Sequence, residues 1–398
     1  MKEIINIIQI SFGRYPLPCK CTGCDNIVYI MSDLLSKYKE LEVCLIDLSS
    51  KRHKNLKTDF KIYEIPNFIY WDDNDLVHIP KVILFNIFVG IKIILLRIFK
   101  KIQIFHVYNQ FTATICVLIK KFIGFNFKVI YTPLSVELVF PPPINLFKAP
   151  LEIFSINNSD CVIAVTPTMY NVLINRYKLP RNKVRQIFLG FEKDIVDKLW
   201  QYKNIPMDKK VVTYVARINR RKNQMTIIKA LNIIAKKYPN IVCNFIGSID
   251  EEDYYLQLID FIKENNLTNN VIFYGTLERE DVFKILINSH LSIIPSKFET
   301  QGLMLIESLG CGVPVIASNI GPFRDVIDLQ PEAGVLVEPD DYESIALHAI
   351  DILSSEEKRT KMSEYAKKLS ERFSWENIVE EIYLLYKDLV NINEERKK

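Results

Sequence analysis

The stretch from Pro295 to Pro322, which reads PSKFETQGLMLIESLGCGVPVIASNIGP, decides the fold. An apolar strand ends at Pro295, Gly302 opens a helix that continues to Leu309, and a second apolar strand covers residues 313–317. Short, fully apolar strands joined by a helix predict a parallel sheet that helices cover on both faces. The same alternation of strand and helix extends from this stretch in both directions.

The alternation occurs in two series along the chain. In the first series, strands are expected at residues 4–10, 43–48, 102–108, 128–131 and 160–165. In the second series, they are expected at residues 209–215, 242–246, 271–274, 291–295 and 313–317. Asn204-Ile205-Pro206 breaks helix between the two series. We therefore predict two doubly wound α/β domains, residues 1–203 and 204–374, and a final helix at residues 375–398 that crosses back to the N-terminal domain.

The composition is that of a packed globular protein. Of the 398 residues, 49% are apolar and 25% charged, and the net charge of +4 is low for a protein that binds nucleic acid. The eight cysteines lack the spacing of a disulfide scaffold, and the cluster of Cys19, Cys21 and Cys24 leaves free thiols or a metal site as alternatives. The first residues lead directly into a buried strand instead of a signal peptide, so we expect a cytoplasmic protein.

Positive charge is concentrated in one part of the chain. Residues 76–136 contain no Asp or Glu, and their eight basic residues are Lys81, Lys92, Arg97, Lys100, Lys101, Lys120, Lys121 and Lys128. Within this stretch residues 82–99 are very apolar, and Asn86, Gly90, Arg97 and Lys101 fall on one narrow stripe at helical spacing. Two interpretations stay open. The segment is either a helix that covers the sheet or an interfacial helix beside anionic lipid, peripheral on the cytoplasmic face of the membrane.

Five residues of the second series have the chemistry of a phosphate and sugar site. The start of the helix at Gly302 presents backbone amides and the positive end of the helix dipole, which suit a phosphate. Arg217 follows a strand, and Lys222 comes five residues later, so that two cations could neutralise a diphosphate. Glu299 precedes the helix and could reach a sugar, whereas Glu307 lies inside the helix and could accept hydrogen bonds from ribose hydroxyls.

This set of residues resembles the E-x7-E donor motif of the retaining glycosyltransferases of family 4, which have the GT-B fold. The residues that match the motif are Glu299, Gly302, Leu303, Glu307, Cys311, Gly312, Pro314 and Val315. Arg217 and Lys222 resemble the Arg-x4-Lys pair that grips the donor diphosphate in this family. Residues 245–247 and 273–277 are similar to the two turns that contact the sugar and the base.

The resemblance implies two facing Rossmann-like domains with an interdomain cleft, and a metal-independent glycosyltransferase of the hexosyltransferase type. The N-terminal domain would bind a glycan or lipid-linked acceptor, and the C-terminal domain a UDP- or GDP-sugar, with retention of the anomeric configuration. The catalytic residues would be Glu299, Arg217 and Lys222. The other donor-binding residues would be Gly247, Gly275, Leu277, Gln301, Gly302, Leu303 and Glu307.

The N-terminal half matches the family pattern more loosely. The acceptor-side residues that the resemblance suggests are Gly23, His106 and Asn109, and a strand-end histidine such as His106 can equally be structural. Many relatives place a histidine near the position of Leu134, and the usual Pro-Asn-Gly turn is Phe188-Leu189-Gly190 in this chain.

The sequence also bears on several other functions. Asp73-Asn74-Asp75 has the spacing of a metal-binding D-x-D motif, but it lies outside the donor motifs. The chain contains no G-x-G-x-x-G sequence, which argues against an NAD dehydrogenase. Two alternatives to a transferase stay open: a sugar-nucleotide epimerase of the same fold, and a non-catalytic relative that binds sugar nucleotides or glycans.

Overall fold

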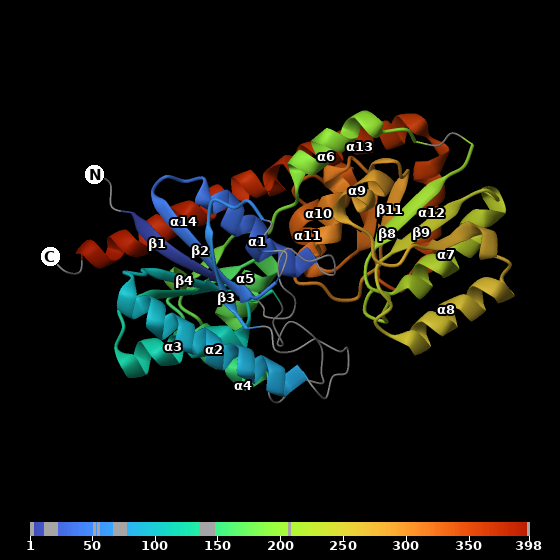
Figure 1. Cartoon of the computed structure of the whole chain (residues 1–398). Coiled ribbons are helices and arrows are strands. Elements are labelled where there is room, and N and C mark those ends of the chain that lie inside the picture. Colours follow the sequence, from blue (N-terminus) through green and yellow to red (C-terminus); the bar gives the residue numbers. More distant parts are fainter. Residues whose placement is uncertain are drawn as a thin grey trace. The chain divides into compact units, whose positions relative to one another are not determined.

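The computed structural model describes residues 4–11, 23–50, 53, 56–66, 78–134, 148–205 and 208–395. Its contacts divide the chain into two compact units. The first unit consists of Met1–Phe188 and Glu376–Lys398, and the second of Leu189–Trp375. Each unit is a parallel sheet with helices packed against it, which confirms the prediction of two doubly wound, Rossmann-like domains (Figure 1).

The first unit is built on a seven-stranded sheet in the order β3-β2-β1-β4-β5-β6-β7. Its strands are β1 Ile5–Ile10, β2 Leu41–Leu48, β3 Lys61–Ile65, β4 Ile104–Val107, β5 Lys128–Tyr131, β6 Cys161–Ala164 and β7 Val184–Gln186. All of these pairs are parallel. Its helices are α1 Gly23–Ser36, α2 His78–Phe99, α3 Gln110–Ile123, α4 Lys148–Asn158, α5 Pro167–Asn175 and, in all but its first residue, α14 Trp375–Glu395.

The second unit has a six-stranded parallel sheet in the order β10-β9-β8-β11-β12-β13. Its strands are β8 Val211–Val215, β9 Val242–Ile246, β10 Val271–Phe273, β11 Leu291–Ile294, β12 Val315–Ser318 and β13 Gly334–Val337. Its α-helices are α6 Lys193–Leu199, α7 Gln224–Lys237, α8 Glu252–Glu264, α9 Arg279–Ile287, α10 Leu303–Gly310, α11 Gly321–Ile327, α12 Tyr342–Ser354 and α13 Glu356–Ser370. Its short 3-10 helices are η5 Trp200–Tyr202, η6 Thr268–Asn270, η7 Pro331–Ala333 and η8 Glu371–Phe373, and η4 Arg181–Lys183 belongs to the first unit.

The unit boundary lies after Phe188, earlier than the predicted position at residue 203. The intervening residues pack on the second unit. The Phe191 amide donates to the carbonyl of Phe373 at 2.9 Å, and a Cβ placed on Gly190 would lie 2.8 Å from the Trp375 ring. Asn204 and Ile205 lie in the loop after η5, whereas Pro206 lies outside the described residues. A loop at this point does not by itself separate two cores.

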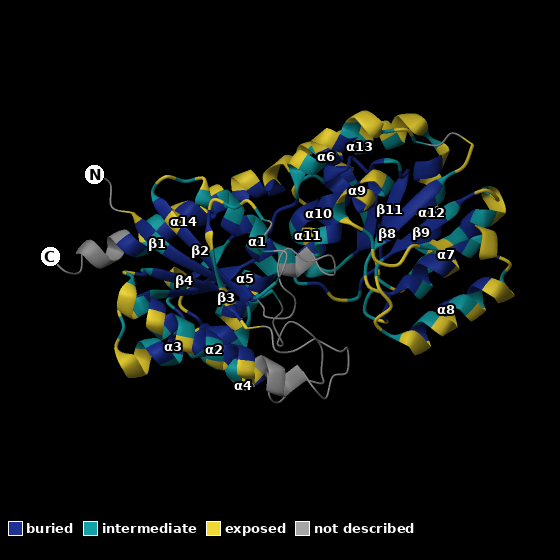
Figure 2. Ribbon diagram, viewed as in Figure 1, coloured by how far each residue is buried: buried dark blue, intermediate teal, exposed yellow. Residues whose placement is uncertain are grey.

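The three strands that the sequence analysis did not predict, β3, β7 and β13, lie at the edges of the two sheets. Their residues are largely half-buried, in contrast to the inner strands, because an edge strand has a neighbour on only one side. Figure 2 shows the buried central strands and the exposed outer faces of the helices. None of the described helices is long and apolar enough to cross a membrane.

Candidate functional site

The predicted donor residues follow four neighbouring strands of the second sheet. Arg217 comes after β8, Gly247 after β9, Gly275 after β10 and Glu299 after β11. Because these strands are parallel and adjacent, their carboxyl ends meet at one edge of the sheet. The turns are also bonded to one another, since the Gly247 amide donates to the Gly275 carbonyl at 2.8 Å.

Two glycines at this edge are required by space and by backbone conformation. Gly247 has φ +147°, and a Cβ there would lie 2.2 Å from the carbonyl oxygen of Ala216. Gly302 has φ +78°, and a Cβ there would lie 2.3 Å from Cε1 of Phe323. Gly302 is also the N-cap residue of α10, and no side chain caps this helix. The first amides of α10 therefore lack a side-chain acceptor and are suited to an anion.

Arg217 lies on a loop that is fixed by its own hydrogen bonds. Gln224 Nε2 donates to the Arg217 carbonyl at 2.9 Å, and the Lys222 amide donates to Asn219 Oδ1 at 3.0 Å. The Arg217 guanidinium forms an ion pair with Asp250 at 2.8 Å, and its side chain remains 48% exposed. An ion pair this exposed contributes little to stability, so the guanidinium can exchange Asp250 for another anion at small cost.

Lys222 and Glu299 form a direct and largely buried ion pair. Their side chains are only 17% and 9% exposed. Burial by itself would raise the pKa of Glu299, but the charges of Lys222 and Arg221, with hydrogen bonds from Lys222 and Ser296, outweigh it and lower that pKa. The Tyr214 hydroxyl lies 3.1 Å from the Lys222 carbonyl and 2.8 Å from Ser296 Oγ, so it joins the two loops. A fixed cation and an ionised carboxylate thus stand side by side.

Glu307 is paired with Arg279, a residue that the sequence analysis did not single out. Arg279 Nη2 donates to Glu307 Oε1 at 2.8 Å, and Arg279 Nε donates to Glu192 Oε1 at 3.1 Å. Burial tends to lower the pKa of Arg279, but the two carboxylates raise it above its ordinary value. Arg279 therefore fixes the orientation of Glu307. Arg279 lies at the start of α9, just after the Gly275 turn, and this position is the sequence signal that could have suggested Arg279 as a site residue.

Gln301 has a structural role in this arrangement. Its Oε1 accepts from the Leu189 amide at 2.7 Å, and its Nε2 donates to the Leu189 carbonyl at 2.8 Å. The side chain is buried, and it holds the turn where the second unit begins. Leu277 and Leu303, the two apolar residues of the predicted donor set, are half-buried.

His106 lies inside a polar network of the first unit. Its Nδ1 is 2.6 Å from the Tyr386 hydroxyl of α14, and its Nε2 is 2.7 Å from Thr132 Oγ1. Gln9 Nε2 and the Tyr108 hydroxyl continue the network, with Gln9 donating to Tyr386 at 2.8 Å. Complete burial lowers the pKa of His106 to about 3. A neutral histidine with both nitrogens engaged is the structural alternative that the sequence analysis left open.

The other residues predicted on the acceptor side lie at helix starts. Asn109 caps α3, where its Oδ1 accepts from the Thr112 amide at 2.9 Å. Gly23 is the first residue of α1. Leu134 is half-buried in the loop after β5. Asp73-Asn74-Asp75 lies outside the described residues, as do Cys19 and Cys21 of the cysteine cluster. Across the part of the chain that the structure describes, no group of three His, Cys, Asp or Glu residues could hold a metal ion.

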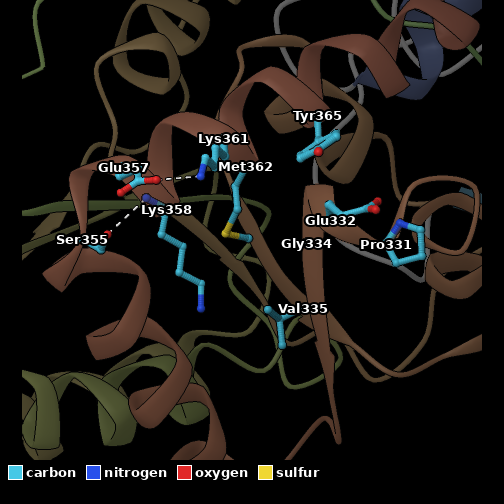
Figure 3. Close-up of a pocket in the computed structure, with 10 residues that line it drawn as sticks. All are labelled: Pro331, Glu332, Gly334, Val335, Ser355, Glu357, Lys358, Lys361, Met362 and Tyr365. Carbon is cyan, nitrogen blue, oxygen red and sulfur yellow. Dashed lines mark hydrogen bonds and ion pairs between the residues drawn. The ribbon is translucent and has the colours of Figure 1, made fainter.

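A pocket of about 530 Å³ lies elsewhere on the second unit, beside β13, η7 and α13 (Figure 3). Val335, Met362 and Tyr365 supply its apolar part, and none of the predicted donor residues lines it. Its charged lining is already engaged, since Lys361 pairs with Glu357 at 2.6 Å. The pocket contains no set of groups that matches the donor chemistry described above.

Family models match most of the chain. The model of glycosyl transferases group 1 matches residues 196–369, and the model of glycosyltransferase family 4 matches residues 55–194. A relative from Methanocaldococcus jannaschii, the uncharacterized glycosyltransferase MJ1607, is 27% identical over 248 residues, which are 60% of this chain and 62% of the relative. The match thus spans less than two thirds of that relative's length.

Solved structures with the same fold cover nearly the whole chain. Sucrose-phosphate synthase from Thermosynechococcus elongatus has a TM-score of 0.81 at 20% identity and covers 98% of this chain and 100% of its own. Anabaena HepE in complex with UDP and glucose has a TM-score of 0.73 at 16% identity, and the match covers 96% of this chain and 99% of HepE. The chain belongs to the family 4 glycosyltransferases with the GT-B fold.

Proposed function

We propose that this glycosyltransferase moves a sugar from a UDP- or GDP-sugar to a glycan or lipid-linked acceptor with retention of the anomeric configuration. The observation that carries the proposal is the contact between Lys222 and Glu299, at the same sheet edge as Arg217 and the uncapped start of α10. Two cations and free helix amides suit a diphosphate, and an adjacent carboxylate suits sugar hydroxyls. The complex of HepE with UDP and glucose is consistent with such a donor.

In this proposal the charges of the second unit stabilise the departing nucleotide. Arg217 and Lys222 would neutralise the diphosphate together with the amides of α10, so that no metal ion is required. Glu299 would bind the transferred sugar, and Glu307 would accept hydrogen bonds from the ribose. The acceptor hydroxyl would attack from the face of the leaving group and pass its proton to a diphosphate oxygen, while the bond between sugar and phosphate breaks.

The acceptor would be bound by the first unit, as in the family pattern. We propose that the acceptor is a glycan or a lipid-linked saccharide, and that the enzyme works at an anionic membrane surface. The support is the stretch of residues 76–136, which is free of acidic residues and contains the very apolar helix α2.

Incubation with UDP- and GDP-sugars tests the reaction. A transferase releases the nucleoside diphosphate by slow hydrolysis, or by transfer when an acceptor is present, and NMR of the product reports the anomeric configuration. Inversion of a stereocentre within the sugar nucleotide would instead identify an epimerase. Binding without turnover would identify a non-catalytic relative. Activity that is unchanged by EDTA would support the metal-independent reaction, and its loss would contradict it.

The diphosphate role has a matched control in the same loop. Arg217→Ala should weaken donor binding by about 10- to 150-fold, which corresponds to the loss of one charge-assisted hydrogen bond of about 1.5–3 kcal/mol. Arg220 is equally exposed, but it pairs with Glu251 and Asp253 on the outside of the unit. Arg220→Ala should therefore leave donor affinity unchanged. Equal effects of the two substitutions would contradict the assignment.

A further inference from the structure

The outer face of α2 is apolar along nearly its whole length. Between residues 83 and 99, the exposed positions are Ile83, Leu84, Ile87, Ile91, Leu95, Ile98 and Phe99. From Leu84 to Ile98 they recur at intervals of three or four residues, so they form one stripe on the helix, and Ile83 and Phe99 adjoin its two ends. Every exposed position in this range is a large apolar residue, whereas a surface helix of a globular protein normally presents charged or polar residues to water.

Two positions of the polar stripe of α2, Asn86 and Gly90, face inward instead. Asn86 is buried, and its Oδ1 accepts from Thr112 Oγ1 of α3 at 3.0 Å. Gly90 is also buried, and a Cβ there would lie 3.3 Å from Ile115 of α3. Two of the four residues of the polar stripe seen in the sequence thus pack against α3, and the isoleucine face remains outside. This orientation is the reverse of the usual amphipathic helix.

The ends of the neighbouring helices extend the same surface. Phe122 is 83% exposed at the end of α3, and Phe99 is 81% exposed at the end of α2. The two helices pack against each other, and Arg97 of α2 donates to the Asn126 carbonyl just beyond α3 at 3.3 Å (Figure 1). We define the outer apolar face as the seven exposed residues of α2 together with Phe122 and Ile123. Two exposed phenylalanines at its margin suit insertion among lipid chains.

The charge around this face selects the kind of partner. Residues 76–136, which include this face, contain eight basic residues and no acidic one. Some of the cations are engaged within the fold, since Lys100 pairs with Glu42 and Lys120 with Asp160, both at 2.6 Å. Lys92 lies over the Tyr63 ring and Lys121 over the Phe154 ring, so their stems cover apolar surface. The face is therefore apolar, and the segment that carries it has an excess of cations, a combination that is complementary to anionic headgroups above acyl chains.

We propose that the outer apolar face lies in the interface of a membrane that contains anionic lipid. The helix would rest parallel to the surface with its isoleucines among the acyl chains, because none of the described helices can span a bilayer. Burial of the apolar stripe would supply the attraction, and the cations would select anionic lipid. Docking would bring the enzyme to the lipid-linked acceptor. The inference rests on the membrane part of the proposed function, but not on the donor chemistry.

Sedimentation with vesicles of phosphatidylcholine, with and without phosphatidylglycerol, tests the inference in the absence of donor. The protein should sediment with the anionic vesicles and less with the neutral ones. Leu95→Asp and Ile91→Asp should each reduce sedimentation to the level without vesicles and leave hydrolysis of the nucleotide sugar unchanged. Leu256→Asp is the matched control, because Leu256 is an exposed leucine on α8 of the second unit, and it should sediment as wild type does.

A second readout does not depend on a charged substitution. Phe122→Trp should show fluorescence that brominated lipid quenches, since the side chain would lie at the depth of the acyl chains. Absence of sedimentation with anionic vesicles, or sedimentation that both Asp variants retain, would overturn the inference. A wild-type dimer that Leu95→Asp converts to a monomer would also overturn it, because a second copy of the chain would then cover this face. Failure of the donor assay would leave the vesicle result unaffected.

Discussion

The ion pair of Lys222 with Glu299 offers a test that separates structure from ligand binding. The substitution Lys222→Met nearly keeps the volume of the side chain but leaves the carboxylate of Glu299 without its closest cation. Breaking a buried pair costs about 3–5 kcal/mol, and the lower end applies here because Lys222 is still 17% exposed and Arg221 remains near Glu299. The second unit should therefore lose about 3 kcal/mol of unfolding free energy at neutral pH.

Thermal unfolding by calorimetry measures this loss. For a unit of this size, each kcal/mol lowers Tm by about 2–4 °C, so Lys222→Met should unfold roughly 6–12 °C below wild type. The double variant Lys222→Met with Glu299→Gln should recover most of the difference, because the buried charge is gone. Lys361→Met, which removes the exposed pair with Glu357, should leave Tm unchanged.

The pH dependence has a definite sign. In wild type Lys222 lowers the pKa of Glu299, so the stabilisation by the pair is present above the ordinary pKa near 4.5 and is lost as the pH falls below it. In Lys222→Met, burial favours the protonated carboxyl, so the variant gains relative stability as the pH falls. The difference in Tm between the two proteins should shrink from pH 7 to pH 4. A constant difference, or a fall in Tm of less than 2 °C at pH 7, would refute the reasoning.

The remaining predictions concern four other residues. Glu307→Gln should raise the donor KM and weaken the binding of free UDP or GDP, while Glu299→Gln should mainly lower kcat; steady-state kinetics and calorimetric titration distinguish the two. Gln301→Leu should lower Tm with little effect on KM, because it leaves the amide and carbonyl of Leu189 without their partners, at about 1–3 kcal/mol for each buried group. His106 should show no NMR titration between pH 5 and 8, because burial lowers its pKa to about 3. The stability that neutral His106 confers should be present above its ordinary pKa near 6.5 and should be lost as the pH falls toward 3. Gly302→Ala should lower both Tm and activity, because residue 302 has a left-handed backbone conformation and the added Cβ would clash with Phe323.

The sequence determined the fold class and brought the predicted donor residues to one edge of a sheet. Short, mostly apolar strands that alternate with helices are typical of a parallel sheet covered on both faces, as the structure has it. The residues after β8, β9, β10 and β11 could be assigned to one site because carboxyl ends of neighbouring parallel strands meet at one edge. Both inferences depend on local pattern and on chain order.

Only the tertiary structure decided the partners of these residues. Arg279 reaches Glu307 across 28 positions, Gln301 reaches Leu189 across 112, and His106 reaches Tyr386 across 280. The sequence around one residue of such a pair carries no information about the distant partner. The orientation of α2 was undetermined for a different reason. Most residues of this helix are apolar on every side, so periodicity could not tell which face packs against α3, and only the packing of Asn86 and Gly90 shows that the isoleucines face outward.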